Sequence, residues 1–300
     1  MLMPTPIREH PIETLRLPNG ADTALDYELG TLLGLYVAEG SGTKYQRYWS
    51  LNAIKERGLI AWVHEAIRTR FNLRTFPKPQ GNCESVVAQA NGWAQFFEQF
   101  GTGAAQKRLP GWVWDAPDEF LQGLLGGMLT GDGSVTDAVA RLSTVSETLS
   151  WQTKLLCQRL GYACSRHSVR EAGAAVIGGR PVMLQEAYAV IWRLDASYSA
   201  GIREDCGVSY QVDHVEAGAG ATVYNFTVEE DHTYTTAAGT VFNCAKFPNV
   251  DFNDQVASCV IAWMYLRRYM DLQIEDDEDT EELELFNPRI LQNQRAGYYG

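Results

Sequence analysis

The sequence LQGLLGGMLTGDG at residues 121–133 decides the fold, because it has an earlier counterpart, LLGLYVAEGS, at residues 32–41. Each stretch predicts an apolar helix that carries small residues on one face and ends in an acidic residue followed by glycine. Small residues let two helix backbones approach closely, and the final glycine suits a left-handed cap. Either stretch alone is also compatible with an ordinary buried helix. Two copies favour a helix pair that brings Glu39 and Asp132 together, where paired carboxylates could hold a divalent cation.

Both motifs are followed by strand and helix patterns. After the first motif, residues 48–52, 73–76 and 85–88 predict short strands, and a helix runs through Glu56 and Ile67. An aromatic stripe at helical spacing, Trp93 to Phe100, predicts a second helix whose apolar face is most simply core. After the second motif, residues 140–144 predict a strand and residues 147–160 a helix.

This pair of motifs resembles the LAGLIDADG homing endonucleases, in the form embedded within inteins. The resemblance covers residues 27–203 and implies an α+β fold of two pseudo-symmetric αββαββα repeats. It implies hydrolysis of double-stranded DNA with Mg²⁺ held by Glu39 and Asp132. The segment QKRLPGWV at residues 106–113 resembles the family segment that places a basic residue near the scissile phosphate, which makes Lys107 the candidate. A surface lysine before a proline turn is the simpler alternative.

No equally convincing lysine follows the second motif, and an arginine such as Arg166, Arg170 or Arg180 could serve there. Strands of both repeats would contact DNA, as the resemblance implies. Phosphate contacts supply affinity and base contacts supply specificity. The candidate DNA-binding residues of the first repeat are Lys44, Arg47, Lys55, Arg68, Arg70 and Arg74. Taken singly, each of these residues is more simply explained as a solvated surface charge.

Residues 204–243 resemble the C-terminal splicing region of inteins, which implies a small all-β (Hint) segment. Asn243 is followed directly by Cys244, and His232 lies upstream in VYNFTVEEDHTY. An asparagine amide can attack its own backbone carbonyl and cut the chain, cysteine is a strong acyl acceptor, and histidine can move the protons. The resemblance therefore implies autocatalytic cleavage before Cys244. Phe242, where histidine is common, and Asn225, where an acidic residue is common, depart from the pattern.

The N-terminal splicing nucleophile is not found, so residues 1–26 are interpreted as a linker or remnant of the splicing domain. Ligation would then need an N-terminal intein fragment supplied in trans. A disrupted gene is the alternative explanation. A further alternative is a trans-splicing module whose endonuclease is degenerate and inactive.

Residues 244–300 resemble the end of a tailed-phage terminase large subunit, where an acidic pair opens a helix. Asp254 is then a further candidate metal ligand, although the same residues fit a simple helix cap. The resemblance implies a C-extein with a helical tail in a phage-infected or prophage-bearing host. Its acidic run EDDEDTEE at residues 275–282 is most simply a solvated segment.

Composition limits these hypotheses only loosely. The net charge of −12 argues against nucleic-acid binding, but about half of it lies in residues 244–300. The six cysteines are scattered without a C-x-x-C pair, which favours a reducing cytoplasm over disulfides or a zinc site. No apolar run is long enough to span a membrane, so no membrane partner is expected.

Overall fold

The computed structural model describes residues 11–177 and 179–195, together with the backbone of five short strands outside them. These strands are Leu2–Pro4 (β1), Ile202–Glu204 (β14), Gly207–Ser209 (β15), Thr233–Thr236 (β16) and Gly239–Phe242 (β17). Strands β1, β15 and β14 form one antiparallel sheet, and β16 pairs with β17. The predicted helical tail and most of the predicted splicing segment lie outside the described residues.

The first repeat runs αββαββα, as the motif pattern predicts. Its elements are α1 (Tyr27–Glu39), β4 (Gly40–Gly42), β5 (Gln46–Asn52), α2 (Arg57–Phe71), β6 (Thr75–Gln80), β7 (Cys83–Gln89) and α3 (Ala94–Glu98). The strands form an antiparallel sheet in the order β4-β5-β7-β6. A short hairpin of β2 (Thr14–Arg16) and β3 (Asp22–Ala24), which the sequence did not predict, precedes α1.

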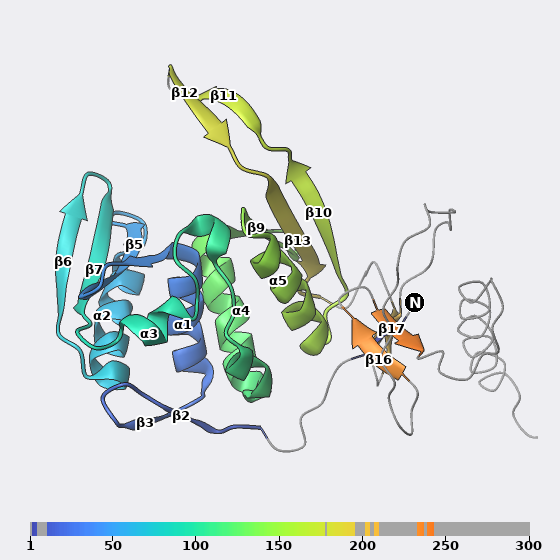
Figure 1. Cartoon of the computed structure of the whole chain (residues 1–300), viewed down its shortest axis with the longest axis horizontal. Coiled ribbons are helices and arrows are strands. Elements are labelled where there is room, and N and C mark those ends of the chain that lie inside the picture. The colour runs from blue at the N-terminus through green and yellow to red at the C-terminus, as the bar shows by residue number, and fades with distance from the viewer. Residues whose placement is uncertain are drawn as a thin grey trace, which may run out of the picture. The chain divides into compact units, whose positions relative to one another are not determined.

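The second repeat has the same order over its described part. It contains α4 (Asp118–Asp132), β8 (Gly133–Thr136), β9 (Val139–Thr144), α5 (Glu147–Arg159), β10 (Cys164–Arg170) and β13 (Ala187–Arg193). Its sheet order, β8-β9-β13-β10, repeats that of the first sheet. An added hairpin of β11 (Gly173–Ile177) and β12 (Arg180–Leu184) extends β10 and β13 and projects from the fold (Figure 1). The predicted mixed α and β architecture is confirmed.

Helices α1 and α4 lie side by side between the two sheets (Figure 1). A Cβ placed on Gly30 would overlap the carbonyl oxygen of Phe120, and one on Gly34 would overlap that of Leu124. The reverse contacts match, because Cβ atoms on Gly123 and Gly127 would overlap the carbonyl oxygens of Tyr27 and Thr31. The helices are therefore parallel and in backbone contact, as the small-residue pattern predicts.

The glycine that follows each helix differs from the expected left-handed cap. Gly40 has φ −83° and Gly133 has φ −109°, so both are extended and begin strands β4 and β8. The expectation of a left-handed cap is wrong. Glycine is needed for space instead, because a Cβ would overlap the Tyr36 carbonyl oxygen at Gly40 and the Leu129 carbonyl oxygen at Gly133.

One apolar core joins the helix pair to both sheets. In β5, Trp49 and Leu51 are buried while the alternating residues Tyr48 and Ser50 are partly exposed, as expected for a sheet with one covered face. The aromatic stripe from Trp93 to Phe100 is buried, which confirms its reading as core. No helix among the described residues has the length and apolar character needed to cross a membrane.

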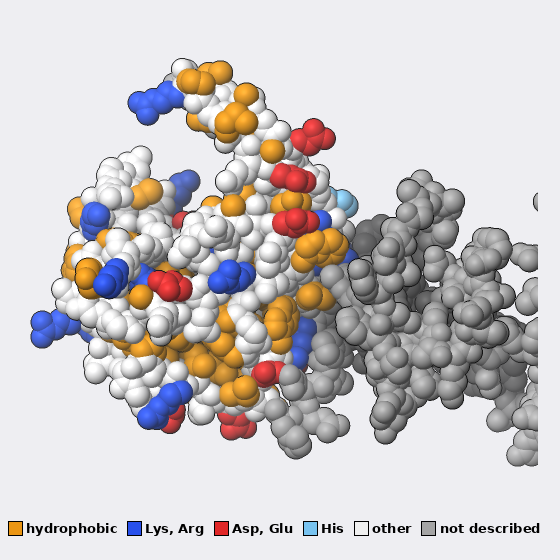
Figure 2. Space-filling view, in the orientation of Figure 1, with side chains coloured by type: hydrophobic (Ala, Val, Ile, Leu, Met, Phe, Trp, Pro, Cys, Tyr) orange, Lys and Arg blue, Asp and Glu red, His pale blue; other side chains and the backbone are white. Residues whose placement is uncertain are grey.

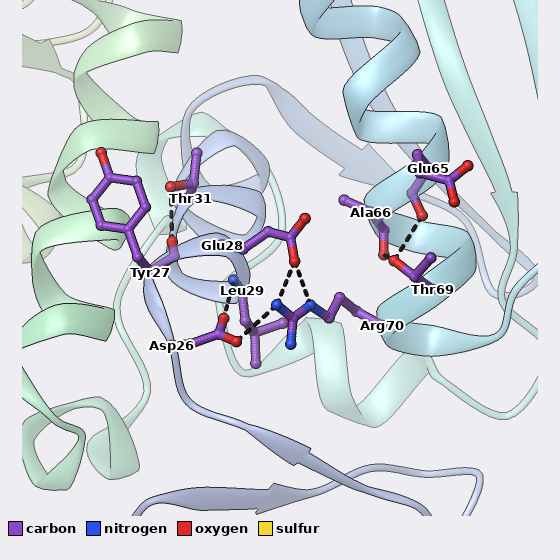
Figure 3. Close-up of polar contacts among 9 residues, drawn as sticks. All are labelled: Asp26, Tyr27, Glu28, Leu29, Thr31, Glu65, Ala66, Thr69 and Arg70. Carbon is purple, nitrogen blue, oxygen red and sulfur yellow. Dashed lines mark hydrogen bonds and ion pairs between the residues drawn. The ribbon is translucent and has the colours of Figure 1, made fainter.

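The start of α1 is tied to the end of α2 by charged side chains (Figure 3). Asp26 caps α1, its Oδ1 accepting from the Leu29 amide at 3.0 Å. Arg70 Nη2 lies 2.7 Å from Asp26 Oδ2, and its Nε donates to Glu28 Oε2 at 2.8 Å. Burial acts to lower the pKa of Arg70, but the hydrogen bonds to Glu28 and Asp26 outweigh it and raise the pKa. Arg70 therefore stays charged and holds two helices together.

Candidate active site

Glu39 and Asp132 are the last residues of α1 and α4, and the parallel packing places both helix ends together. A Cβ on Gly131, the residue before Asp132, would lie 3.1 Å from the Cγ of Glu39. The C-terminal ends of two parallel helix dipoles add partial negative charge to that of the two carboxylates. This end of the helix pair is consequently suited to a cation.

The ionisation of both carboxyl groups reflects that crowding. Burial first, and then the charges of Asp132 and Glu56, raise the pKa of Glu39 to about 7, against the attraction of Lys107. Burial also raises the pKa of Asp132, while Lys107 acts in the opposite direction. Full ionisation at neutral pH therefore depends on added positive charge, because like charges in a partly buried site repel each other.

Lys107 contributes one such charge. It is only 7% exposed, and its Nζ donates to the carbonyl oxygens of Tyr36 at 2.9 Å and Gly40 at 2.7 Å. The same atom lies 4.8 Å from the centre of the Tyr36 ring. Burial lowers the pKa of Lys107 to about 8, although the charges of Asp132 and Glu39 partly oppose this. Lys107 is thus an interior side chain at the candidate site and not an exposed lysine.

Residues of the second repeat hold the Lys107 segment in place. The buried Ser146 Oγ donates to the Lys107 carbonyl oxygen at 2.6 Å and accepts from the Leu149 amide at 3.1 Å, which caps α5. Gln152 accepts from the Leu109 amide at 2.7 Å and donates to the Leu109 carbonyl oxygen at 2.9 Å. The sequence interpretation missed Ser146 and Gln152. A serine before a helical pattern signals a cap, but its long-range partner has no local signal.

The residues present fit a divalent cation that binds together with a substrate. The described part of the chain contains no group of three or more His, Cys, Asp or Glu side chains able to hold a metal. Mg²⁺ is commonly bound by one or two carboxylates and completes its shell with water and substrate phosphates. The pair of Glu39 and Asp132, at a helix end that favours positive charge, meets that requirement.

The outer face of the first sheet carries polar and aromatic side chains that the sequence interpretation did not select. Ser50 and Ser85 lie opposite each other with their Oγ atoms 2.9 Å apart. Lys78 Nζ lies 5.4 Å from the centre of the Tyr48 ring on the same face. The alternation of apolar and polar residues in the sequence, Trp49-Ser50-Leu51-Asn52, is the signal that could have identified this face.

The six candidate DNA-binding residues occupy different environments. Lys44, Lys55, Arg68 and Arg74 are exposed, and Arg68 forms an ion pair with Glu65. Arg47 is only 4% exposed, on the helix side of β5, and Arg70 is held by Asp26 and Glu28. Neither Arg47 nor Arg70 presents its guanidinium to the outer face of the sheet.

The three arginines considered for the second repeat lie on strands other than β8, the strand that follows Asp132. Arg166 and Arg170 lie on β10, the edge strand that β9 and β13 separate from β8, and Arg180 lies on the projecting β12. Arg166 is also enclosed between the rings of Trp151 and Tyr188, at 4.2 and 4.3 Å from their centres. A role for one of these arginines as the second basic catalytic residue stays a prediction. His232, Asn243, Cys244 and Asp254 lie outside the described residues.

Comparisons with curated proteins give partial matches. No family model matches the chain. The RNA polymerase subunit Rpo1C of Methanocaldococcus jannaschii is 33% identical over 121 residues, which is 40% of this chain and 14% of that protein. An iron–sulfur cluster assembly SufBD family protein of Mycobacterium tuberculosis is 26% identical over 235 residues, which is 74% of this chain and 28% of that protein. The chain thus spans less than a third of the length of these relatives.

The similar solved structures include homing endonucleases. A mesophilic variant of the homing endonuclease I-DmoI aligns with a TM-score of 0.43 and 11% identity, over 57% of this chain and 90% of that chain. The N-terminal LAGLIDADG domain of DUF199/WhiA aligns with a TM-score of 0.33 and 11% identity, over 57% of this chain and 76% of that chain. Other structures of I-DmoI contain DNA with manganese or calcium. At this similarity neither comparison assigns an activity to this chain.

Proposed function

We propose that the chain is a site-specific endonuclease that hydrolyses both strands of a DNA duplex with Mg²⁺ held by Glu39 and Asp132. The observation that carries the proposal is the meeting of these two carboxylates at the ends of two parallel, glycine-packed helices, with Lys107 beside them. When bound, Mg²⁺ would supply an activated water and stabilise the leaving oxygen.

The chain's own groups would position the substrate and manage charge and protons. Glu39 and Asp132 would orient the metal, and their ionisation would be favoured by it. Lys107 has a pKa of about 8, so it would be available near neutral pH to balance charge on the phosphate or to accept a proton. The outer faces of the two sheets, with Tyr48, Ser50 and Lys78 on the first, would read base edges in the major groove.

Incubation with duplex DNA that carries the uninterrupted insertion site tests this proposal. With Mg²⁺ the parent chain should cut both strands, and Glu39→Gln and Asp132→Asn should lose at least about 100-fold in rate, the scale of a lost electrostatic contribution. Exposed Glu119 at the opposite end of α4 supplies the matched control, Glu119→Gln, which should retain activity. No double-strand cut by the parent, with Glu39→Gln and Asp132→Asn behaving like it, would favour the degenerate, inactive endonuclease. Equal cutting by all three chains would contradict the assigned role of the two carboxylates.

We also propose that the C-terminal region cleaves before Cys244 by cyclisation of Asn243, assisted by His232. In the sequence His232 directly precedes β16 and Asn243 directly follows β17, and these two strands pair with each other. The pairing of β1 with β15 also supports a shared splicing remnant, made of residues 1–26 with residues 204–243. Ligation would need an N-terminal fragment in trans, and residues 244–300 would be a terminase C-extein with Asp254 as a possible metal ligand.

Mass spectrometry of the purified chain tests the cleavage. The parent should release a fragment that begins at Cys244, whereas Asn243→Ala should stay intact because it has no amide to cyclise. Co-expression with an upstream intein fragment tests ligation, and absence of a joined product would count against splicing in trans.

A further inference from the structure

A cavity lies beside the candidate active site, on the helix side of the first sheet. It has a volume of about 250 Å³ and is lined by two glycine-containing loops, residues 40–44 and 101–103, with Tyr36, Arg47 and Glu98. The first loop begins at Gly40, directly after Glu39, and the Gly40 carbonyl oxygen accepts from Lys107. The cavity therefore shares a wall with the carboxylate pair.

Arg47 is the unusual side chain of this cavity. It is 4% exposed, and its Nη1 donates to the carbonyl oxygens of Thr43 and, at 2.9 Å, of Gln46. Its Nη2 donates to the Ala94 carbonyl oxygen at 3.3 Å. The buried Nε has no hydrogen-bond partner, and within residues 11–195 no carboxylate lies within ion-pair distance of Arg47.

A buried guanidinium without a counter-ion is costly, because its charge has left water without gaining an opposite charge. The same cavity is lined by Lys44, so two cations face one carboxylate, the exposed Glu98. Tyr36 adds a hydroxyl that stays protonated, since burial raises its pKa to about 12. Positive charge thus exceeds negative charge among the residues that line this cavity.

We propose that the cavity binds a phosphate group through Arg47 and Lys44, and that this group is a DNA backbone phosphate close to the phosphate at which the strand is cut. The assignment of the phosphate to DNA rests on the proposed function. A phosphate would supply the missing negative charge beside Arg47 and could pair with Lys44. Gly40 gives the reason for choosing DNA, because it lines the cavity and directly follows Glu39, so a strand held at Glu39 and Asp132 would pass close to the cavity.

Thermal unfolding of the full chain without DNA tests the pocket separately from nuclease activity. Inorganic phosphate should raise the Tm of the parent above its value in chloride of equal ionic strength, because a ligand of the native state stabilises it. Lys44→Gln should weaken the apparent affinity for phosphate by roughly tenfold, as expected for loss of a charge-assisted contact. Arg57→Gln also removes one positive charge, from an exposed site outside the cavity that is not among the candidate DNA-binding residues, and should behave as the parent.

Arg47→Met should abolish the phosphate response, but it also removes three bonds to backbone carbonyls and could unfold the sheet edge. Lys44→Gln is therefore the variant that decides whether the cavity binds phosphate. A parent Tm that does not rise with phosphate beyond chloride would overturn the pocket. An equal rise in Lys44→Gln and the parent would overturn it as well.

Duplexes with a neutral methylphosphonate at single positions distinguish the two sources of phosphate. If the pocket takes the DNA backbone, one methylphosphonate should weaken binding of the parent and have no further effect on Lys44→Gln. If phosphate ion binds but no position is coupled to Lys44, the source is free phosphate and the DNA clause is overturned. A chain that binds phosphate in the pocket but never cuts DNA would instead count against the proposed nuclease.

Discussion

At the scale of single residues, the candidate site is governed by the cost of placing like charges in a partly buried space. Burial raises the pKa values of both Glu39 and Asp132, and the neighbouring charge of Asp132 raises the pKa of Glu39 further. An arrangement of this kind is expected to lower stability in the absence of a bound cation, as in the usual conflict between function and stability.

This conflict predicts a pH-dependent stability of the metal-free protein. The folded pKa of Glu39 is about 7, above its usual 4.5, so the folded state binds more protons than the unfolded state between these values. Stability should therefore fall as pH rises from about 4.5 to 7. Glu39→Gln should be more stable than the parent at pH 8 by about 1–2 kcal/mol, after allowance for partial exposure.

Urea unfolding at pH 4 and pH 8, without divalent cation, measures this difference. The advantage of Glu39→Gln should shrink at the lower pH, where Glu39 is protonated in both states. Added Mg²⁺ should stabilise the parent at pH 8 more than Glu39→Gln. An advantage of equal size at both pH values would contradict the assigned cause.

At the scale of elements, the helix pair depends on four glycines that leave no space for a side chain. Gly30 and Gly34 face α4, and Gly123 and Gly127 face α1, each against a backbone carbonyl that cannot swing away. Helix interiors otherwise prefer alanine to glycine by roughly 1 kcal/mol. Close contact therefore outweighs helix propensity at these positions.

Neighbouring glycines of α4 provide a matched test of this contact. Gly127→Ala should destabilise the protein by about 1–3 kcal/mol, because its Cβ would overlap the Thr31 carbonyl oxygen. Gly126→Ala should be neutral or stabilising, since its Cβ would lie 3.5 Å from the Tyr27 hydroxyl. Thermal unfolding of both variants decides the matter, and similar losses in both would argue against close packing.

Helix α2 offers a second matched pair, Arg70 and Arg68. Arg70→Ala should lower the free energy of unfolding by about 1–3 kcal/mol, because it removes charged hydrogen bonds to Glu28 and Asp26. Arg68→Ala removes only an exposed ion pair with Glu65 and should lower it by less than about 0.5 kcal/mol. Denaturant unfolding measures both losses. A larger loss for Arg68→Ala would contradict the structural role of Arg70.

At the scale of the whole fold, the two repeats are alike in strand order but unequal in length. The β6–β7 hairpin turns at Gly81, whereas β10 and β13 continue into β11 and β12 (Figure 1). Figure 2 shows apolar side chains along this hairpin and a positive group near its end. Its exposed residues include Val176, at 71%, and Met183, at 76%. A duplex that follows both sheets would meet this hairpin on one side only.

Replacing residues 171–186 by a two-residue turn tests that asymmetry. The register pairs Arg170 with Ala187, so a tight turn can close the remaining strands. Each removed strand has five residues, about 17 Å at 3.3 Å per residue, so the protected DNA should shorten on one side by about 5 base pairs. Hydroxyl-radical footprinting measures the change. An unchanged footprint would show that the hairpin does not follow the duplex.

The sequence by itself determined the repeated helices, the strands that follow them and the positions of Glu39 and Asp132. These features depend on local periodicity and on small residues that permit close helix contact, and both are visible along the chain. It also selected Lys107, although through a family resemblance and not through its surroundings.

Only the tertiary structure decided how the remaining side chains are used. Lys107 reaches the Tyr36 carbonyl oxygen across 71 positions of sequence, Arg70 reaches Glu28 across 42, and Arg47 turns toward the covered side of its sheet. An isolated basic residue carries no local mark that separates a surface charge from an interior contact. Its environment is made by segments distant in sequence, because burial and electrostatic pairing arise from packing.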